Sequence, residues 1–273
     1  MTEGEGAKML LGRQVAGPAE YAPEVLFPIA RQQAREELGI TSPTLPFYGE
    51  DIWHAYELSW LLPDGRPTIF LGRLHIPATS PNLVESKSLK LYLNSLNTTV
   101  FDSEQAALAT IEPDLSKAIG CPVTFSLFRP DDPSFAGVNL SGHCIDSQFL
   151  PVSKASGRSC LTAAGSDVSE VLYSHLLRSL CPVTGQPDWA SVWLRYRGPK
   201  IDQGSLLAYL LGFREHQEFH EQCVERMFID IDAACSPGYL EVQALYTRRG
   251  GLDICPWRSS EPGIAPVHRM NRQ

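Results

Sequence analysis

Two segments of the chain repeat one order of predicted elements. Residues 85–128, moved along by 117 positions without a gap, fall on residues 202–245. The shift places Ser88-Leu89 on Ser205-Leu206, Tyr92-Leu93 on Tyr209-Leu210 and Glu104-Gln105 on Glu221-Gln222. The identities are few, but the shared order of elements indicates an internal duplication. In this register Lys87 and Lys90 correspond to Gly204 and Leu207, and Ser103 corresponds to His220, which predicts two specialised copies.

Hydrophobic periodicity and turn residues predict the elements of each half. In the first half we expect strands at 54–62 and 67–76, helices from Ser86 and over 103–118, and a strand at 123–128. In the second half we expect a helix at 167–180, because Asp167 and Glu170 have the spacing of a capping box. A strand at 189–196, helices at 203–213 and 219–234 and a strand at 240–246 follow. Residues 1–50 are interpreted as an arm or lead-in with one short helix at 32–38.

Strands grouped with helix pairs, without strict β-α alternation, predict an α+β fold with antiparallel sheets covered on one face by helices. No G-x-G-x-x-G sequence follows a strand, which disfavours a doubly wound dinucleotide-binding fold. With 273 residues, of which 43% are hydrophobic, the chain can form about two domains.

Composition excludes several classes of protein. A net charge of −8 argues against a nucleic-acid-binding protein, although a local basic patch could bind a phosphorylated ligand. No apolar run reaches the roughly 18 residues of a membrane helix, and the N-terminal sequence does not resemble a signal peptide. The seven cysteines include no C-x-x-C pair, so neither a disulfide framework nor a zinc finger is indicated. We therefore expect a cytoplasmic protein.

The segment from Cys181 to Asp188 is the strongest candidate for chemistry. A cysteine follows a predicted helix, and a Pro- and Gly-containing loop carries an acid seven residues later. Cys181 is either a buried structural thiol or a nucleophile with Asp188 beside it. The C-terminus of a helix disfavours a resting thiolate, so a nucleophilic Cys181 at that position needs another source of activation.

Other segments have residues that suit a heterocycle or a phosphate. His220-Glu221 opens a helix and, like Glu85, could bind the edge of a heterocycle, although charges at a helix start are often simply solvated. Ser86, Lys87 and Lys90 combine a helix N-terminus with two cations, which suits phosphate. Arg248-Arg249-Gly250-Gly251 could clamp a phosphate or form a plain hairpin tip. Together these segments favour a phosphorylated cofactor.

The same residues resemble the signatures of one family, the NADPH-dependent 7-cyano-7-deazaguanine reductases, which are the nitrile reductases of queuosine biosynthesis. The resemblance is carried by residues 84–95, by Cys181 through Trp189, by Phe219 through Cys223 and by Tyr246 through Gly251. Residues 45–49 and 56–60 match as well, so it covers nearly the whole chain in the long, two-module form of the family.

This resemblance implies two tandem ferredoxin-like modules of the tunnelling fold, at residues 1–150 and 151–273, in a homodimer. It implies that Cys181 forms a covalent thioimide with the nitrile and that Asp188 donates a proton. Val84, Glu85, Ser86, His220 and Glu221 would bind the deazaguanine, a free small molecule. The residues implied for NADPH binding are Ser86, Lys87, Arg249 and Gly250, and no metal is expected.

Two other functions remain open on the sequence. A purine or pterin hydrolase, similar to the zinc-dependent GTP cyclohydrolases, could share the fold but needs a metal, whose ligands are not recognisable in the spacing of this sequence. A non-catalytic purine-binding module is the other alternative. Metal analysis and ligand-dependent NADPH oxidation discriminate among the three.

Overall fold

The computed structural model describes residues 17–150, 157–266 and 269–273. The chain divides into two compact units, and each unit is assembled from segments far apart in the sequence. Unit 1 contains residues 52–135, the N-terminal residues up to Gly39 and Arg248–Asp253, whereas unit 2 contains Ile40–Asp51, Ala136–Thr247 and Ile254–Gln273. The module boundary at residue 150 stays a prediction.

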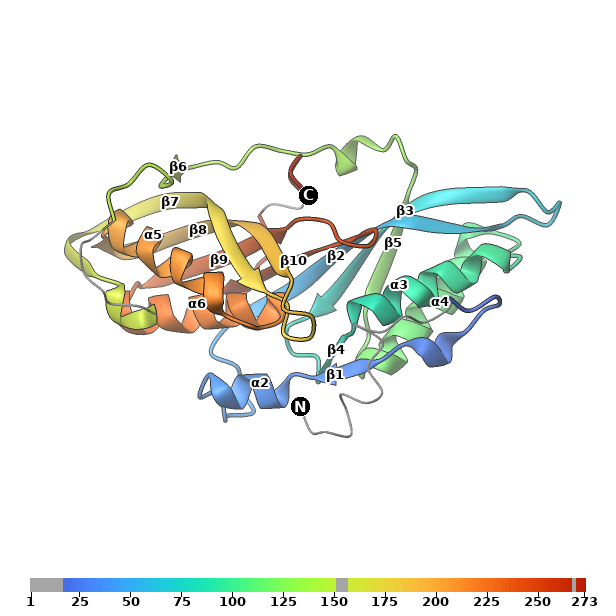
Figure 1. The fold of residues 1–273 in the computed structure, drawn as a ribbon, viewed down its shortest axis with the longest axis horizontal. Coiled ribbons are helices and arrows are strands. Elements are labelled where there is room, and N and C mark those ends of the chain that lie inside the picture. The colour runs from blue at the N-terminus through green and yellow to red at the C-terminus, as the bar shows by residue number, and fades with distance from the viewer. Residues whose placement is uncertain (1–16, 151–156, 267–268) are drawn as a thin grey trace. The chain divides into compact units, whose positions relative to one another are not determined.

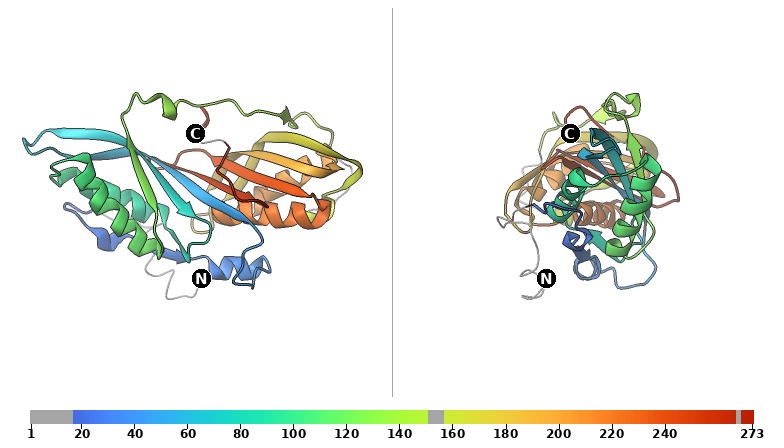
Figure 2. Two further views of the ribbon diagram at one scale, coloured as in Figure 1. Left: turned by 180° about the vertical axis from the view of Figure 1, so that it is seen from behind. Right: turned by 90° about the vertical axis from the view of Figure 1, so that its right-hand side faces the viewer.

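Unit 1 is a layer of strands with two longer helices and one short one. The strand β3 (Pro67–Pro77) lies between β2 (Tyr48–Leu61) and β5 (Thr124–Phe128), and β1 (Pro28–Ala30) pairs with β4 (Asn82–Val84). Two helices, α3 (Ser86–Ser95) and α4 (Glu104–Ile119), lie side by side next to β5 (Figure 1), and Figure 2 shows the same arrangement from behind. Every fourth residue of α4 is buried, namely Ala107, Ile111, Leu115 and Ile119, so one apolar stripe packs α4 into the core of unit 1. The short helix α2 (Gln32–Glu37) confirms the prediction for 32–38.

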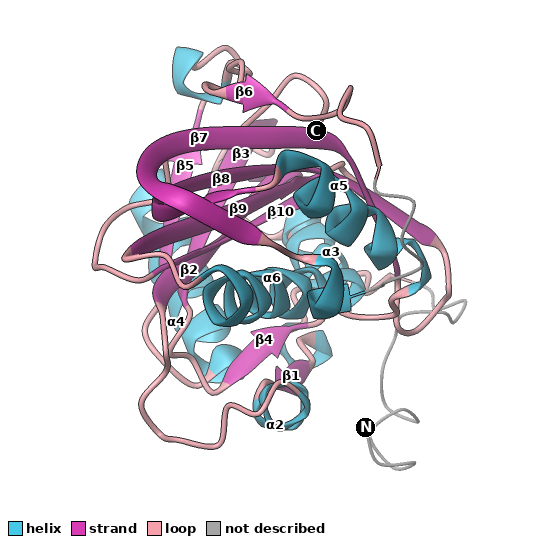
Figure 3. Cartoon of the chain, turned by 90° about the vertical axis from the view of Figure 1, so that its left-hand side faces the viewer, coloured by secondary structure: helices cyan, strands magenta, loops and turns pink. Residues whose placement is uncertain are grey.

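Unit 2 is built around a long antiparallel hairpin. The strands β7 (Ala163–Leu180) and β8 (Pro187–Ile201) pair along their length, β9 (Tyr239–Tyr246) pairs with β8, and β10 (Leu252–Ser259) pairs with β9. The two-residue strand β6 (His143–Cys144) lies parallel to β7. Two helices, α5 (Gln203–Gly212) and α6 (His220–Cys235), lie on one face of these strands (Figure 3). The α+β fold with antiparallel sheets and helices on one face is confirmed, and it is consistent with tunnelling-fold modules.

The helix predicted at 167–180 is wrong, because these residues belong to strand β7. Glu170, interpreted as part of a capping box, lies opposite Tyr196 of β8 and accepts a hydrogen bond from its hydroxyl at 2.6 Å. Local capping signals are weak beside a long ladder of interstrand hydrogen bonds, which here pairs most of β7 with β8 despite two shifts of register. With this correction both halves have the same order of two strands, two helices and a strand.

The structure confirms the repeat in its first helix in detail. Both α3 and α5 have ten residues and begin 117 positions apart. The N-cap carboxylates of Glu85 and Asp202 accept from backbone N–H groups of the first turn, and Ser88 and Ser205 donate to the N-cap carbonyls at 2.7 and 2.8 Å. These shared caps are independent of tertiary packing, which is why the sequence predicts both helices well.

The register changes by one residue before the second helix. The 16-residue helices α4 and α6 start at Glu104 and His220, an offset of 116, and both end in a left-handed residue, Gly120 and Ser236. The ungapped register is therefore wrong beyond α5, and the N-cap Ser103 corresponds to Phe219 rather than to His220. The helix pairs keep one common contact, since Tyr92 donates to Asp114 at 2.7 Å and Tyr209 donates to Asp230 at 2.8 Å.

Candidate active site

Cys181 lies in the tight loop that joins β7 to β8. Its backbone N–H donates to the Gln186 carbonyl at 2.8 Å, and its carbonyl accepts from the Gly185 N–H at 2.9 Å. Gly185 has φ +66°, which a residue with a side chain rarely adopts. Cys181 follows a strand and not a helix, so the objection from a helix C-terminus to a nucleophilic thiol no longer applies. The thiol-bearing residue is 5% exposed, in a loop closed on both sides by hydrogen bonds.

Asp188 is held on β8 at the other end of this loop. It lies opposite Ser179 of β7, two residues before Cys181, and only 4% of it is exposed. Its Oδ2 is 3.3 Å from Nε2 of His220, the first residue of α6. The hairpin register thus brings an acid and a thiol to the same end of two paired strands, and α6 adds an imidazole to the acid.

Tyr246, at the end of β9, completes the surroundings of His220. Its ring stacks on the imidazole with centroids 3.8 Å apart and planes inclined by 15°. Tyr246 is fully buried, and its carbonyl accepts from Nε2 of Gln273 at 3.2 Å. The imidazole is fixed between a buried ring and a buried carboxylate, which restricts its rotation. Sequence reasoning did not assign a role to Tyr246, because the stacking depends on the β8–β9 pairing, which no local pattern encodes.

Glu221 and Cys223 follow His220 on α6. Glu221 is 3% exposed, so this carboxylate belongs to the interior and not to a solvated helix start. Burial, with a smaller contribution from the charge of Glu218, raises the pKa of the fully buried Cys223 thiol far above its ordinary value. A thiol with so high a pKa stays protonated, which argues against Cys223 as a nucleophile.

The remaining predicted residues gather in unit 1, around the start of α3. Val84 ends β4 and Glu85 caps α3, and both are buried. The Glu85 carboxylate accepts from the N–H groups of Lys87 at 2.7 Å and Ser88 at 2.8 Å. Burial raises the pKa of Glu85, and these two hydrogen bonds lower it in part. Each carboxylate oxygen can accept a further hydrogen bond, so the cap does not exclude a ligand.

The turn at Gly250-Gly251 lies against the side of α3 that carries Lys90. A Cβ built on Gly250, which has φ +59°, would lie 3.3 Å from Cδ of Lys90. Nζ of Lys90 is 3.3 Å from a carboxylate oxygen of Glu57, and Arg249 precedes the glycine. The turn is also a hairpin tip, with an isolated bridge between Arg249 and Leu252. The cationic side chains can donate hydrogen bonds to phosphate oxygens. The glycine backbone, which a Cβ would crowd, allows a close approach, so this set of groups fits the phosphates of a dinucleotide.

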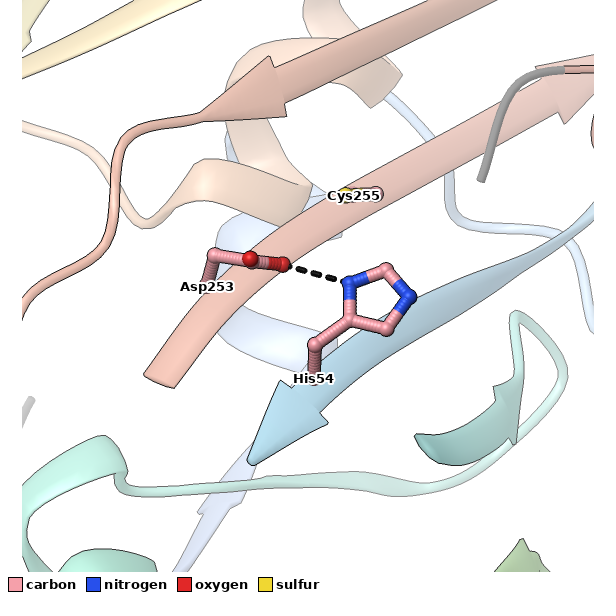
Figure 4. A group of neighbouring side chains, drawn as sticks. All are labelled: His54, Asp253 and Cys255. Carbon is pink, nitrogen blue, oxygen red and sulfur yellow. Dashed lines mark hydrogen bonds and ion pairs between the residues drawn. The ribbon is translucent and has the colours of Figure 1, made fainter. Parts of the chain in front are cut away.

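His54, Asp253 and Tyr56 form a hydrogen-bonded network, and Arg248, beside the turn, contacts the ring of Tyr56. Nδ1 of His54 lies 2.6 Å from Asp253, whose second oxygen accepts from the Tyr56 hydroxyl at 2.5 Å (Figure 4 shows the His54–Asp253 contact). The Arg248 guanidinium lies 3.6 Å from the centre of the Tyr56 ring. This network fixes the position of the residue beside Arg249.

His54, Asp253 and Cys255 are also residue types that bind metals, and Cys255 lies two residues further along β10 (Figure 4). However, Nδ1 of His54 already contacts Asp253, and Nε2 accepts from Arg73 at 3.2 Å. Neither imidazole nitrogen is available without breaking a buried hydrogen bond. This group therefore does not fit a catalytic metal site.

The predicted residues thus form two groups, one in each unit. Cys181, Asp188, His220 and Glu221 come together in unit 2, and Val84, Glu85, Ser86, Lys87, Arg249 and Gly250 lie in unit 1. Within the described residues, no helix is both long and apolar enough to cross a membrane.

Comparisons with known proteins identify the family of the chain. Residues 18–127 match the family described as nitrile reductase, 7-cyano-7-deazaguanine-reductase N-term, and residues 187–263 match the family described as QueF-like protein. A curated NADPH-dependent 7-cyano-7-deazaguanine reductase of Stenotrophomonas maltophilia is 53% identical, and the match covers 93% of each chain. Proteins of the same name from Chromohalobacter salexigens and Dechloromonas aromatica are 49% and 51% identical, with 94% of this chain and 92% of each relative covered. The chain belongs to the family of NADPH-dependent 7-cyano-7-deazaguanine reductases.

Proposed function

We propose that this chain reduces the nitrile of 7-cyano-7-deazaguanine to the aminomethyl group of 7-aminomethyl-7-deazaguanine, with NADPH, in queuosine biosynthesis. The observation that carries the proposal is the hairpin with Cys181 and Asp188 at its two loop ends, in a chain about half identical to reductases of that name. The full reaction adds two hydrides and two protons to one C≡N group. NADPH, when bound, supplies the hydrides.

Cys181 and Asp188 would perform the first step together. A nitrile carbon is a weak electrophile, so it needs a sulfur nucleophile and a proton for its nitrogen. The Cys181 sulfur forms a bond to carbon, one π bond of the nitrile breaks, and Asp188 gives its proton to the nitrogen. The thiol proton passes to the Asp188 carboxylate, so no net proton is gained or lost. The product is a thioimide on Cys181. Concerted transfer means that a free thiolate need not persist.

The same sulfur leaves in the second half of the reaction. Once the thioimide carbon is reduced, the C–S bond breaks and the nitrogen lone pair forms an imine, so Cys181 is regenerated as a thiol. A second reduction of the imine carbon and protonation of the nitrogen give the amine. Water would hydrolyse the imine, so burial of Cys181 and Asp188 supports this chemistry.

The other predicted residues would bind the two ligands. His220 and Glu221, with Val84, Glu85 and Ser86, would bind the deazaguanine, because buried carboxylates can accept from the N–H groups of its heterocycle. Ser86, Lys87, Arg249 and Gly250 would bind NADPH through its phosphates. We further propose a cytoplasmic homodimer, which size-exclusion chromatography with light scattering would test.

Mass spectrometry tests the first step directly. Protein mixed with 7-cyano-7-deazaguanine, without NADPH, should gain the mass of the whole substrate molecule on Cys181. Addition of the thiol to the nitrile releases no leaving group, so no mass is lost. NADPH should then discharge the adduct. A metal-dependent hydrolase or a binding module forms no such adduct.

Variants assign the roles. Cys181→Ala should abolish the adduct while the base still binds, and Asp188→Asn should slow adduct formation because the nitrogen loses its proton source. The other six cysteines are internal controls. An adduct on any of them, with Cys181 unmodified, contradicts the assignment.

A further inference from the structure

We propose that unit 2 carries a binding site for a phosphorylated adenosine, formed by Trp189, Arg178, Arg214 and Arg272. These four residues are called the Trp189–arginine cluster. The three guanidinium carbons lie 5.9, 5.7 and 5.9 Å from the centre of the Trp189 indole, in the order Arg178, Arg214, Arg272. Three different segments therefore bring cations to one aromatic ring.

The cluster is built on the hairpin that carries the catalytic loop. Arg178 of β7 lies directly opposite Trp189 of β8, one pair further from the loop than Ser179 and Asp188. Because side chains alternate along a strand, Trp189 points to the face opposite that of Asp188. Trp189 is 36% exposed, so part of its ring is open to a ligand.

Backbone carbonyls accept hydrogen bonds from two of the three guanidinium groups, those of Arg178 and Arg272, without neutralising them. Arg178 donates to the carbonyl of Arg214 at 3.5 Å, and Arg272 donates to the carbonyl of His175 at 2.5 Å. In the part of the chain that the structure describes, none of the three guanidinium groups forms an ion pair with a carboxylate. By contrast, Arg195 and Arg197 of β8, the strand that carries Trp189, form ion pairs with Glu241 and Glu261. Three like charges at one ring repel each other, and in a chain of net charge −8 this local excess favours an anionic ligand.

The residue types specify the ligand class. A partly exposed indole face stacks on a base, and the planar forks of arginine bind phosphate oxygens in pairs. An adenosine carrying phosphate has both features. Because Ser86, Lys87, Arg249 and Gly250 are the residues proposed for the catalytic NADPH, the ligand of this cluster is either the adenosine end of a second cofactor molecule or a free adenine nucleotide. The shared chemistry is a purine ring with an adjacent phosphate.

A binding titration without 7-cyano-7-deazaguanine tests the cluster in the absence of any reaction. The probe is adenosine 2′,5′-bisphosphate, which has the phosphorylated adenosine of NADPH but no nicotinamide to absorb indole emission. Of the five tryptophans, Trp53, Trp60, Trp193 and Trp257 are each at most 3% exposed, so a change in emission reports mainly on Trp189. The measurement involves neither Cys181 nor Asp188, so its outcome is independent of the roles proposed for them.

The expected result is a saturable change in emission in the unmodified protein. Arg214→Gln and Arg272→Gln should each weaken binding by about tenfold or more, the loss of one charge-assisted hydrogen bond. Arg197→Gln is the matched control, because this exposed arginine of β8 already has a carboxylate partner, and its affinity should not change. No saturable change, or an equal loss in Arg197→Gln, would overturn the proposal.

Competition then identifies the source of the ligand. Displacement of the probe by NADP⁺ at lower concentration than by ATP assigns the cluster to the adenosine end of a second cofactor molecule. The reverse order assigns it to a free adenine nucleotide. Trp189→Ala removes the fluorescence signal, so the affinity of this variant for the probe is measured by equilibrium dialysis. Unchanged affinity in that variant contradicts a stacking role for the indole.

Discussion

At the scale of single residues, the proposed site depends on a few buried polar groups whose partners are known. Asp188 is buried beside His220, and His220 is stacked on Tyr246. A buried carboxylate without a hydrogen-bonding partner would be costly, so each of these groups fixes the next one. Substitutions that keep the shape and most of the hydrogen bonds of these side chains should therefore change binding or chemistry more than the fold.

Lys87→Ala should weaken NADPH binding more than NADH binding. A cation that contacts the 2′-phosphate contributes only when that phosphate is present. Dissociation constants for both cofactors, measured on the unmodified protein and the variant, check this. Equal losses for the two cofactors would transfer the phosphate-reading role to Ser86 or Arg249.

Glu221→Gln should lower the affinity for 7-cyano-7-deazaguanine by about 1.5–3 kcal/mol, the contribution of a charge-assisted hydrogen bond. The change keeps the shape of the side chain but replaces one acceptor with a donor. Calorimetric titration measures the affinity, and a thermal melt of the variant controls for the fold. Unchanged affinity in a folded variant would leave Glu85 as the recognition carboxylate.

At the scale of elements, the cap of α3 combines a structural role with a proposed binding role. Glu85 accepts two backbone hydrogen bonds, which its charged form strengthens and which stabilise the start of the helix. Burial disfavours the same charged form and raises the pKa of Glu85. A carboxyl whose pKa is higher in the folded state takes up a proton more readily when folded. Its contribution to stability is therefore present at low pH and is lost as the pH rises through the raised pKa.

This sign gives a pH prediction for Glu85→Gln, a variant that cannot titrate. The free energy of unfolding of the unmodified protein, minus that of the variant, should fall as the pH rises from about 4 to 7. Urea unfolding of both proteins across this range measures the difference. A difference that rises with pH would show that the two hydrogen bonds outweigh burial at Glu85.

At the scale of the whole chain, segments distant in sequence meet in the interior of unit 2. Arg258 of β10 donates to Asp51, at the start of β2, and to Glu225 of α6, both at 2.8 Å. The Arg258 and Asp51 side chains are fully buried, and that of Glu225 is 4% exposed. Two carboxylates share one guanidinium, which raises the pKa of Arg258 despite its burial.

Arg258→Met should lower the free energy of unfolding by about 3–5 kcal/mol, because it leaves two buried carboxylates without their cation. Chemical denaturation measures the loss. Adding Asp51→Asn and Glu225→Gln removes both charges and should recover much of the stability. If the triple variant is as unstable as the single one, the loss comes from packing of the arginine stem and not from charge.

The sequence by itself determined the starts of the paired helices α3 and α5 and the family of this protein. Residues such as Glu85, Ser88, Asp202 and Ser205 set helix starts through hydrogen bonds within one turn, and the predicted starts of α3 and α5 agree with the structure. The motifs around Cys181 and Lys87 indicated the family, which the comparisons confirmed. The roles of the individual site residues stay predictions.

Only the tertiary structure decided the state of residues 163–180 and the partners of the site. Residues 167–180 carry a local helix signal, yet they form β7 because β8 pairs with most of them, with one shift of register between Ser174 and Leu177. The one-residue change of register before α6, the stacking of Tyr246 on His220 and the ion triad of Arg258 have the same origin. Each depends on which distant strand or helix lies alongside, and that pairing is set by the burial and hydrogen bonding of whole elements, which local sequence patterns do not contain.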